Sequence, residues 1–307
     1  MRKQLVSVAF LSALALASCS KDESLSNESK VPVSFSTSVQ TRASVEGSSF
    51  ADGTEIGVFA TPGAISPTAP AWAATNFIQN DKSTVTSGVV TTSTTYWYGI
   101  SGEQIKVAAY YPYSTNVTTA AGAAPVVNYT ITGQEDLMAG TTASPLLDKT
   151  LATTPANSVI TFNHLLTQLK FSAIAGAGSA GMNITKISVA GKNSFQVSLG
   201  TYEATAVGTT TGLFDAAILN GGAVAAAGTT AAQVGGAVMV EPGLNKFDVI
   251  VTLGGTATFT VPVAPASGTF EKGKSYNVIF TINKSGISAT AVIVPWADGG
   301  NASGTIG

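Results

Sequence analysis

The sequence predicts an all-β protein: two tandem antiparallel β-sandwich domains that follow a signal peptide. Short runs in which apolar and polar residues alternate recur along the chain, and turn-favouring residues separate them. Alternation with a period of two is typical of strands, whereas an amphipathic helix needs a period of 3.6. The best helical candidate, Ala223 to Val240, is interrupted by Gly228 and by Gly235 and Gly236. Many short strands between turn signals are typical of sandwiches.

The composition excludes several classes of function. The 307 residues include 15 Lys and Arg, 17 Asp and Glu, one His and one Cys, with a net charge of −2. This balance provides no basic surface for nucleic acid. A single Cys excludes intramolecular disulfides and multi-thiolate metal sites, and a single His excludes zinc sites that need several imidazoles. Hydrophobic residues make up 45% of the chain, which is enough to form the cores of about two domains.

Residues 1–18 have the features of a secretory signal peptide. Arg2 and Lys3 form its charged start, and the apolar run that follows is shorter than the ~20 residues of a membrane-spanning helix. The last residues before Cys19, Leu16-Ala17-Ser18, resemble the lipobox of bacterial lipoproteins, in which the Cys is acylated and becomes the first residue. We expect Cys19 to carry the lipid anchor, because the only Cys of the chain stands at the position that the lipobox requires. The alternative is an ordinary signal peptide with an incidental Cys.

Residues 19–30 form a polar segment, which we expect to be a flexible tether. Lys21, Asp22 and Glu23 resemble the surface-export signal of Bacteroidetes lipoproteins, a Lys followed by acidic residues just after the lipidated Cys. A plain solvated tether would have a similar composition. The sequence therefore predicts a protein held by lipid in the cell outer membrane and exposed at the cell surface.

The strand pattern begins at Val31 and continues to Val294. A segment from Thr141 to Asn157 with two prolines indicates a boundary, so we expect domains at 31–160 and 161–307. The clearest alternating runs are 31–35, 56–59, 105–110, 169–174, 187–189, 195–199, 247–251, 259–261, 276–280 and 287–294. From the inward positions of the strands we expect a core that contains Phe35, Ile56, Val58, Val107, Phe162, Leu169, Phe171, Val197, Val249, Val278, Phe280 and Val292.

Residues that could carry chemistry do not form a catalytic set. The glycines from Gly176 to Gly181 fit the spacing GxGxxG, but a strand is predicted after them, so we expect a hairpin loop. His164 has no second His, Cys or clustered carboxylates near it in the sequence, and we expect a structural role for it. Asp136 follows Glu135, and nothing in the sequence identifies a partner for either. We expect no catalytic residue, no metal site and no cofactor.

A series of motifs runs in order along the chain. They are Gln40-Thr41-Arg42-Ala43, Phe50 to Phe59, Tyr96-Trp97-Tyr98, Tyr110-Tyr111-Pro112-Tyr113, Asp136 to Ala139, Phe162 to Phe171, Lys272 to Val278 and Val294 to Gly299. Behind a lipobox, this series resembles the fimbrillin family of Bacteroidetes, the type V pilins and their fimbrillin-like relatives. The resemblance implies transthyretin-like sandwiches, a non-catalytic fimbrial subunit or adhesin, and other fimbrial subunits as partners.

The same resemblance implies a route of assembly. In type V pilins, an arginine-specific cut removes the first strand, and a strand of the next subunit fills the groove. Here Val31 to Val39 is an amphipathic strand, and Arg42, followed by Ala43, is the only Arg after the signal peptide. The donor would lie in Ile287 to Val294 or in the tail to Gly307. The alternative is that Arg42 is a solvated loop residue and the first strand stays in place.

A second interpretation of function is a surface lipoprotein that binds glycan or another small ligand. Exposed aromatic side chains would form its site, and the candidates are Trp72, Trp97 and Tyr111. Tryptophans in a β-rich chain are more often core or edge residues than sugar-stacking platforms. Under this interpretation the partners include a host surface or a glycan.

Overall fold

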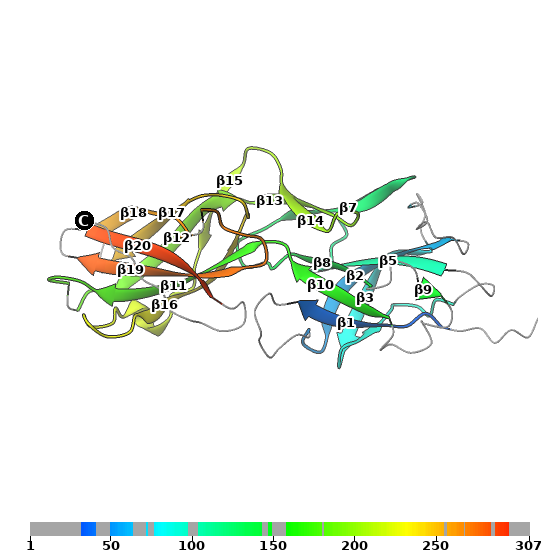
Figure 1. Ribbon diagram of the computed structural model, residues 1–307, viewed down its shortest axis with the longest axis horizontal. Coiled ribbons are helices and arrows are strands. Elements are labelled where there is room, and N and C mark those ends of the chain that lie inside the picture. The colour runs from blue at the N-terminus through cyan, green and yellow to red at the C-terminus, as the bar shows by residue number, and fades with distance from the viewer. Residues whose placement is uncertain are drawn as a thin grey trace, which may run out of the picture. The chain divides into compact units, whose positions relative to one another are not determined.

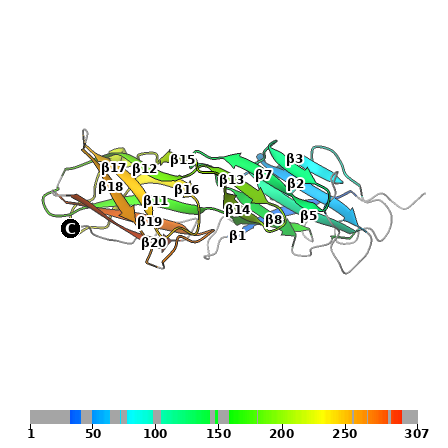
Figure 2. The ribbon, with the colours of Figure 1, turned by 90° about the horizontal axis from the view of Figure 1, so that it is seen from above.

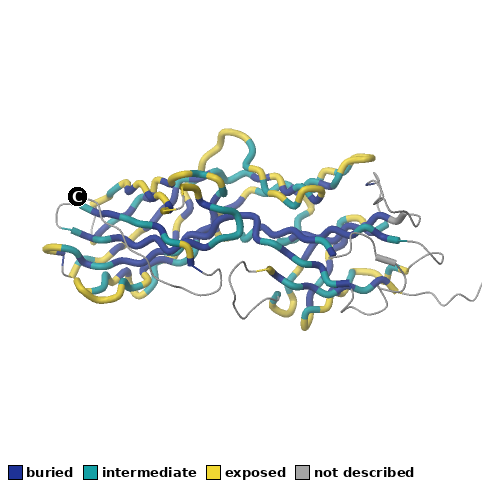
Figure 3. Tube along the Cα trace, in the orientation of Figure 1, coloured by how far each residue is buried: buried dark blue, intermediate teal, exposed yellow. Residues whose placement is uncertain are grey.

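The structure is a computed structural model that describes residues 32–40, 50–63, 72, 77–97, 104–142, 147–148, 158–179, 181–254, 257–266, 268–283 and 286–294. These residues form strands in the order β1 to β20, with one short 3-10 turn at Asn220–Gly222 (Figure 1). The all-β class is therefore confirmed. Strand interiors are buried, and exposed residues concentrate in the connections (Figure 3).

The N-terminal part of the described chain forms a closed sheet of seven strands. These strands are β1 (Phe35–Gln40), β2 (Thr54–Gly63), β3 (Ile78–Thr86), β4 (Val89–Thr91), β5 (Gln104–Tyr111), β8 (Met138–Thr142) and β10 (Val159–His164). They pair in the order β2-β3-β4-β1-β10-β8-β5, and β5 pairs with β2 to close the ring. The short β9 (Leu147–Asp148) also pairs with β5.

The closed sheet replaces the open two-sheet sandwich that we expected for residues 31–160. It closes because β2 pairs with β3 at Thr54–Ala60 and with β5 at Gly57–Gly63, so both edges of β2 are paired. The antiparallel arrangement that we expected also has exceptions, since β1 runs parallel to β10, and residues 168–175 run parallel to residues 275–282. Parallel neighbours need a long connection between them, and here the whole ring separates the two strands in the sequence. The expected domain division between residues 160 and 161 falls inside β10 and stays a prediction.

The C-terminal part contains two four-stranded sheets (Figure 2). One has the order β16-β11-β19-β20 and the other β15-β12-β17-β18, and side chains of both contribute to one buried apolar cluster. Because β11 and β12 lie in different sheets, the glycine-rich segment between them is a connection between sheets, not the hairpin loop that we expected. The strand bounds are β11 (Thr167–Ala175), β12 (Ile184–Lys192), β15 (Thr211–Asp215), β16 (Ala232–Val240), β17 (Phe247–Leu253), β18 (Ala257–Val263), β19 (Ser275–Asn283) and β20 (Gly286–Val294).

A fourth sheet combines strands from both parts of the chain. Its order is β14-β13-β7-β6, with β6 (Val117–Ala120), β7 (Ala123–Thr130), β13 (Ser194–Ser198) and β14 (Glu203–Ala206). The link is the antiparallel pairing of β7 with β13, from Ser194 opposite Thr130 to Ser198 opposite Val126. The hairpin of β6 and β7, which comes before β8 of the closed sheet, is thereby hydrogen-bonded to β13, which comes after β12.

The predicted core is buried except at one position. Val292 is only half-buried, whereas Ala291 beside it is fully buried. Directly paired residues share a face of a sheet, and Ala291 pairs with the buried Val278. The prediction for β20 was therefore one residue out of phase, because Val292 gives a stronger apolar signal than Ala289 and Ala291. The confirmed core residues are Phe35, Ile56, Val58, Val107, Phe162, Leu169, Phe171, Val197, Val249, Val278 and Phe280.

Candidate functional site

The first strand, β1, lies inside the closed sheet with a neighbour on each side. On one side, Ser36 to Gln40 pair in parallel with Val159 to Asn163 of β10. On the other side, Phe35 and Ser36 pair with Val90 and Val89 of β4 in the antiparallel direction. The strand predicted at 31–39 is therefore present, with its regular part shifted toward Gln40. Its removal would break the ring at two ladders at once.

The alternation of β1 sends every second side chain into the core. Val33, Phe35, Thr37 and Val39 are buried, whereas Ser34, Ser36 and Ser38 are half-buried. Phe35 has no exposed surface and is one of the largest fully buried side chains of the chain. Val33, Phe35 and Val39 belong to a separate apolar cluster that includes side chains of β2, β3, β5 and β10. β1 thus supplies part of the core as well as part of the ladder.

The residues that lead into β1 are bonded to the segment that follows β4. The Val33 amide donates to the Tyr96 carbonyl oxygen at 2.9 Å, and Pro32 forms a bridge with Trp97. Farther along the strand, the Thr37 amide donates to the Gly88 carbonyl oxygen at 2.8 Å. Residues 88–97 therefore hold the first half of β1, and β10 holds the second half.

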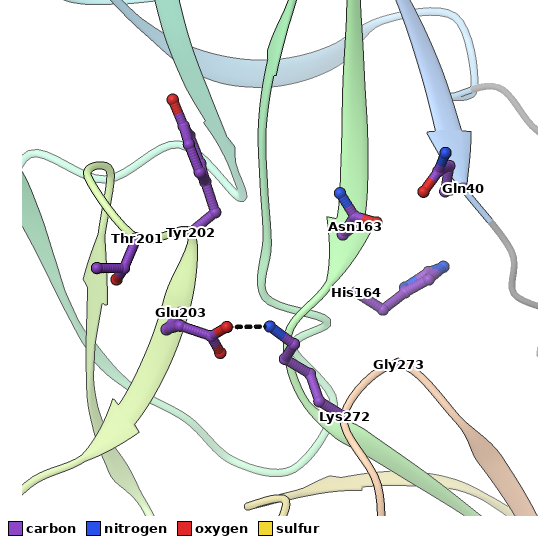
Figure 4. Close-up of a pocket in the computed structure, with 8 residues that line it drawn as sticks. All are labelled: Gln40, Asn163, His164, Thr201, Tyr202, Glu203, Lys272 and Gly273. Carbon is purple, nitrogen blue, oxygen red and sulfur yellow. Dashed lines mark hydrogen bonds and ion pairs between the residues drawn. The ribbon is translucent and has the colours of Figure 1, made fainter. Parts of the chain in front are cut away.

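A polar cavity of about 190 Å³ lies at the end of β1 (Figure 4). Gln40 and two residues of β10, Asn163 and His164, line one side. Across the cavity, Glu203 accepts a hydrogen bond from Lys272, and the two form an ion pair. The other lining residues are Thr201, Tyr202 and Gly273. The end of β1 therefore lies beside polar groups from the C-terminal part of the chain.

His164 is held by a carboxylate that the sequence did not connect with it. Its Nδ1 lies 2.7 Å from Oδ2 of Asp136, and both side chains are largely buried. The other carboxyl oxygen of Asp136 has no hydrogen-bond partner among the described residues. The pair is separated by 28 residues, a spacing that carries no recognisable signal, so only the fold reveals it. The pairing agrees with the structural role that we expected for His164.

We expect the free energy of unfolding to depend on pH through Asp136. Burial raises the pKa of this carboxyl above its ordinary value of 3.8, and the hydrogen bond and charge of His164 only partly oppose the shift. A carboxyl with a raised folded pKa stabilises the fold when protonated, and that contribution is lost as the pH rises from 3.8 through the folded pKa. Urea unfolding across this range should show wild type losing stability relative to Asp136→Asn.

Asp215 provides a control of opposite sign. A hydrogen bond from Ser188, together with Lys186, lowers the pKa of the Asp215 carboxyl. Its contribution is present above 3.8 and is lost as the pH falls through the folded pKa. Asp215→Asn should therefore differ from wild type most at neutral pH and least at acidic pH. A stability difference between wild type and Asp136→Asn that does not change with pH would contradict the assignment to Asp136.

Comparison with known proteins identifies the family. A family model described as fimbrillin-like matches residues 41–296. The chain belongs to the fimbrillin-like family. The family match begins directly after β1, which ends at Gln40. No curated protein matches the chain at a significant level.

Solved structures of several Bacteroides proteins have the same fold. A proposed cell adhesion protein of Bacteroides uniformis has 21% identity and a TM-score of 0.61, covering 86% of this chain and 99% of that one. A proposed cell adhesion protein of Bacteroides ovatus has 20% identity and a TM-score of 0.61, with 87% and 98% covered. A fimbrial protein of Bacteroides vulgatus has 16% identity and a TM-score of 0.56, with 86% and 99% covered. At these identities the likeness shows the fold.

The three candidate ligand-binding aromatics of this fimbrillin-like chain lie in different environments. Trp72 is buried in the larger apolar cluster, with Nζ of Lys106 4.7 Å from its ring centroid. Tyr111 is half-buried, and its ring centroid lies 5.3 Å from that of Phe50. Of the three, only Trp97 is exposed, at 43% of its surface. Trp72 thus has the core position that is usual for tryptophan.

The other candidate residues lie outside the described part of the chain. They are Cys19, Lys21, Asp22, Glu23, Arg42 and Ala43, and their roles stay predictions. Among the described residues, no group of three or more His, Cys, Asp or Glu side chains could hold a metal ion. In the same part of the chain, no helix is long and apolar enough to cross a membrane.

Proposed function

We propose that the protein is a surface-anchored, non-catalytic fimbrial subunit or adhesin that assembles by donor-strand exchange. Its anchor is an acyl group on Cys19 in the outer membrane, and Lys21, Asp22 and Glu23 direct it to the cell surface. Membership of the fimbrillin-like family, and the fold shared with a fimbrial protein, support a structural role with other fimbrial subunits as partners. The proposed two domains meet close to β10.

The observation that carries this proposal is the position of β1. It is bonded on both sides within the ring, and Arg42 follows only two residues after its end. A cut after Arg42 would free the strand, leaving unpaired backbone groups on β4 and β10 and vacant positions in the core. A strand from a second subunit would restore both, which is β-augmentation. The donor segment would lie in Ile287 to Val294, within the edge strand β20, or in the tail to Gly307.

Replacing Arg42 with alanine should block assembly, because the chain has no other arginine after Arg2. The wild-type surface form should begin at Ala43, whereas the Arg42→Ala form should begin at the acylated Cys19 and remain monomeric. N-terminal sequencing of protein sheared from cells, with electron microscopy of the fibres, measures both. Wild-type fibres whose subunits still begin at Cys19 would rule out the cut, and they would leave the lipid anchor supported.

Binding of glycan or another small ligand is the second candidate function. One observation favours it: Trp97 exposes a large aromatic surface beside the exposed Pro32, with which it forms a bridge. Aromatic faces of this kind stack on the apolar faces of sugar rings. Such a site would lie beside the residues that lead into β1.

Trp97→Ala should abolish any glycan-array signal of the protein if this second function is real. The matched control is Leu213→Ala, since Leu213 is the most exposed large hydrophobic side chain described, at 58%. Leu213→Ala removes a mostly exposed side chain and should cost less than about 0.5 kcal/mol of stability. Trp97 is more than half covered, so the urea midpoint of Trp97→Ala is measured beside its glycan signal to show that the variant is folded. A signal that survives Trp97→Ala would exclude Trp97 as the ligand platform.

A further inference from the structure

The two neighbours of β1 run in opposite directions relative to it, and each holds a different half of the strand. Antiparallel contacts hold its first half: the Val33 amide bonds to Tyr96, and Phe35 pairs with Val90. Parallel contacts hold its second half, from Ser36 opposite Val159 to Gln40 opposite Asn163. A strand inserted in the reverse direction would run antiparallel to β10 and parallel to β4, so it could not reproduce the hydrogen bonds that β1 makes. The contacts of the site are therefore built for one direction of the strand that fills it.

The inward positions of the site differ in size. Phe35 fills the largest one and is completely buried, opposite Val90 and within the apolar cluster of the ring. Val33 and Val39 fill smaller positions and keep 7% and 8% exposure. Buried area, and with it hydrophobic free energy, is therefore concentrated at position 35.

Position 37 differs from the other inward positions because it is polar. The Thr37 amide and its Oγ1 both donate to the Gly88 carbonyl oxygen, at 2.8 and 3.4 Å. Gly88 has φ of +76° and closes the turn between β3 and β4. A small hydroxyl side chain meets this carbonyl oxygen without a desolvation cost, whereas a large apolar side chain would bury the oxygen without a side-chain partner.

We infer that the β1 site selects its incoming strand through one aromatic subsite, at position 35, and accepts that strand only parallel to β10. This inference rests on the proposed strand exchange and specifies its partner. The partner is a strand of a different fimbrial subunit, with an aromatic residue at position 35, an aliphatic residue two positions before it, a small hydroxyl residue two after it, and an aliphatic residue four after it. Residues 287–294 of this chain contain no aromatic residue, so β20 of a second copy would leave the subsite unfilled. A slip of one residue would place the positions of Ser34, Ser36 and Ser38 in the core, so the register is fixed as well.

The test uses the complete chain cut with an arginine-specific protease, which finds one arginine after Arg2. A fluorescent peptide of residues 31–40 competes with unlabelled variants in low denaturant, and anisotropy measures its binding. The Phe35→Ala peptide should bind at least about 100-fold more weakly than the wild-type peptide, because truncation of a buried Phe leaves a large cavity. Phe35→Leu should lose about tenfold or less.

Two controls isolate the anchor and the direction. Ser34→Ala changes a half-buried side chain for which no hydrogen bond is found among the described residues, and binding should stay within about twofold. The reversed peptide, QVSTSFSVPV, keeps the composition and the alternation and should not bind. The uncut chain should bind none of the peptides, because its own β1 fills the site.

The outcomes separate this inference from the proposed function. Equal binding of the wild-type and Phe35→Ala peptides, or of the forward and reversed peptides, would overturn the inference while strand exchange stands. Failure of the wild-type peptide to bind the cut chain would overturn both. Binding of the wild-type peptide with loss for Phe35→Ala and for the reversed peptide would establish the subsite and its direction.

Discussion

Replacing Gly140 with alanine should lower the free energy of unfolding by about 3 kcal/mol or more. Gly140 lies in β8, opposite Phe162 of β10 on one side and Ala109 of β5 on the other. A Cβ at this glycine would lie 2.2 Å from the backbone oxygen of Thr161. The neighbour is backbone and cannot rotate away, so β8 and β10 would have to separate and the ring would open beside β1.

Gly286→Ala is the matched control, because it also places alanine in a strand of this chain. An added Cβ at Gly286, the first residue of β20, meets no atom within 4 Å, and replacing glycine with alanine lowers the conformational entropy of the unfolded chain. Urea unfolding should therefore give a similar or higher midpoint for Gly286→Ala and a much lower one for Gly140→Ala. Equal midpoints for the two variants would show that β8 and β10 do not approach each other as closely as described.

The strands with strong alternation could be predicted from sequence because their inward residues are large and apolar. Phe195 and Val197 in β13, or Val249 and Val251 in β17, define an inner face without any knowledge of their partners. β3 could not be found in this way. Its inward positions include Asp81 and Ser83, which are buried and bonded to each other at 2.6 Å. Buried polar residues at inward positions remove the apolar signal on which a strand prediction depends.

The ring and the β1 site depend on pairings between residues far apart in the sequence. Ser36 pairs with Val159, and Val58 pairs with Ala109, and no local pattern specifies either partner. The sequence could show that residues 31–39 form an amphipathic strand with an arginine shortly after it. It could not show that this strand is hydrogen-bonded on both edges. Because of this pairing, removal of the strand would leave an open site that a strand of another subunit could fill.

Asp81→Ala should lower the free energy of unfolding by about 3 kcal/mol, because hydrogen bonds to buried charged groups contribute about 1.5–3 kcal/mol each and abandoned donors add a penalty. Only 4% of Asp81 is exposed. Its carboxylate accepts hydrogen bonds from Ser83 Oγ at 2.6 Å, from the Ser93 amide at 3.0 Å and from Ser93 Oγ at 2.5 Å. Tyr96 Oη donates a further bond at 3.0 Å, and burial raises the pKa of this phenol, which keeps its proton in place.

The same variant should loosen β1, since Asp81 fixes the segment that holds the start of that strand. Tyr96 and Trp97 contact Val33 and Pro32, so hydrogen exchange at the Val33 amide should accelerate in Asp81→Ala before global unfolding. Asp248→Ala is the control: Asp248 is an exposed strand residue, and its loss should change stability by less than about 0.5 kcal/mol. If hydrogen exchange at the Val33 amide were as slow in Asp81→Ala as in Asp248→Ala, the Asp81 carboxylate would not be the group that holds the first half of the β1 site in place.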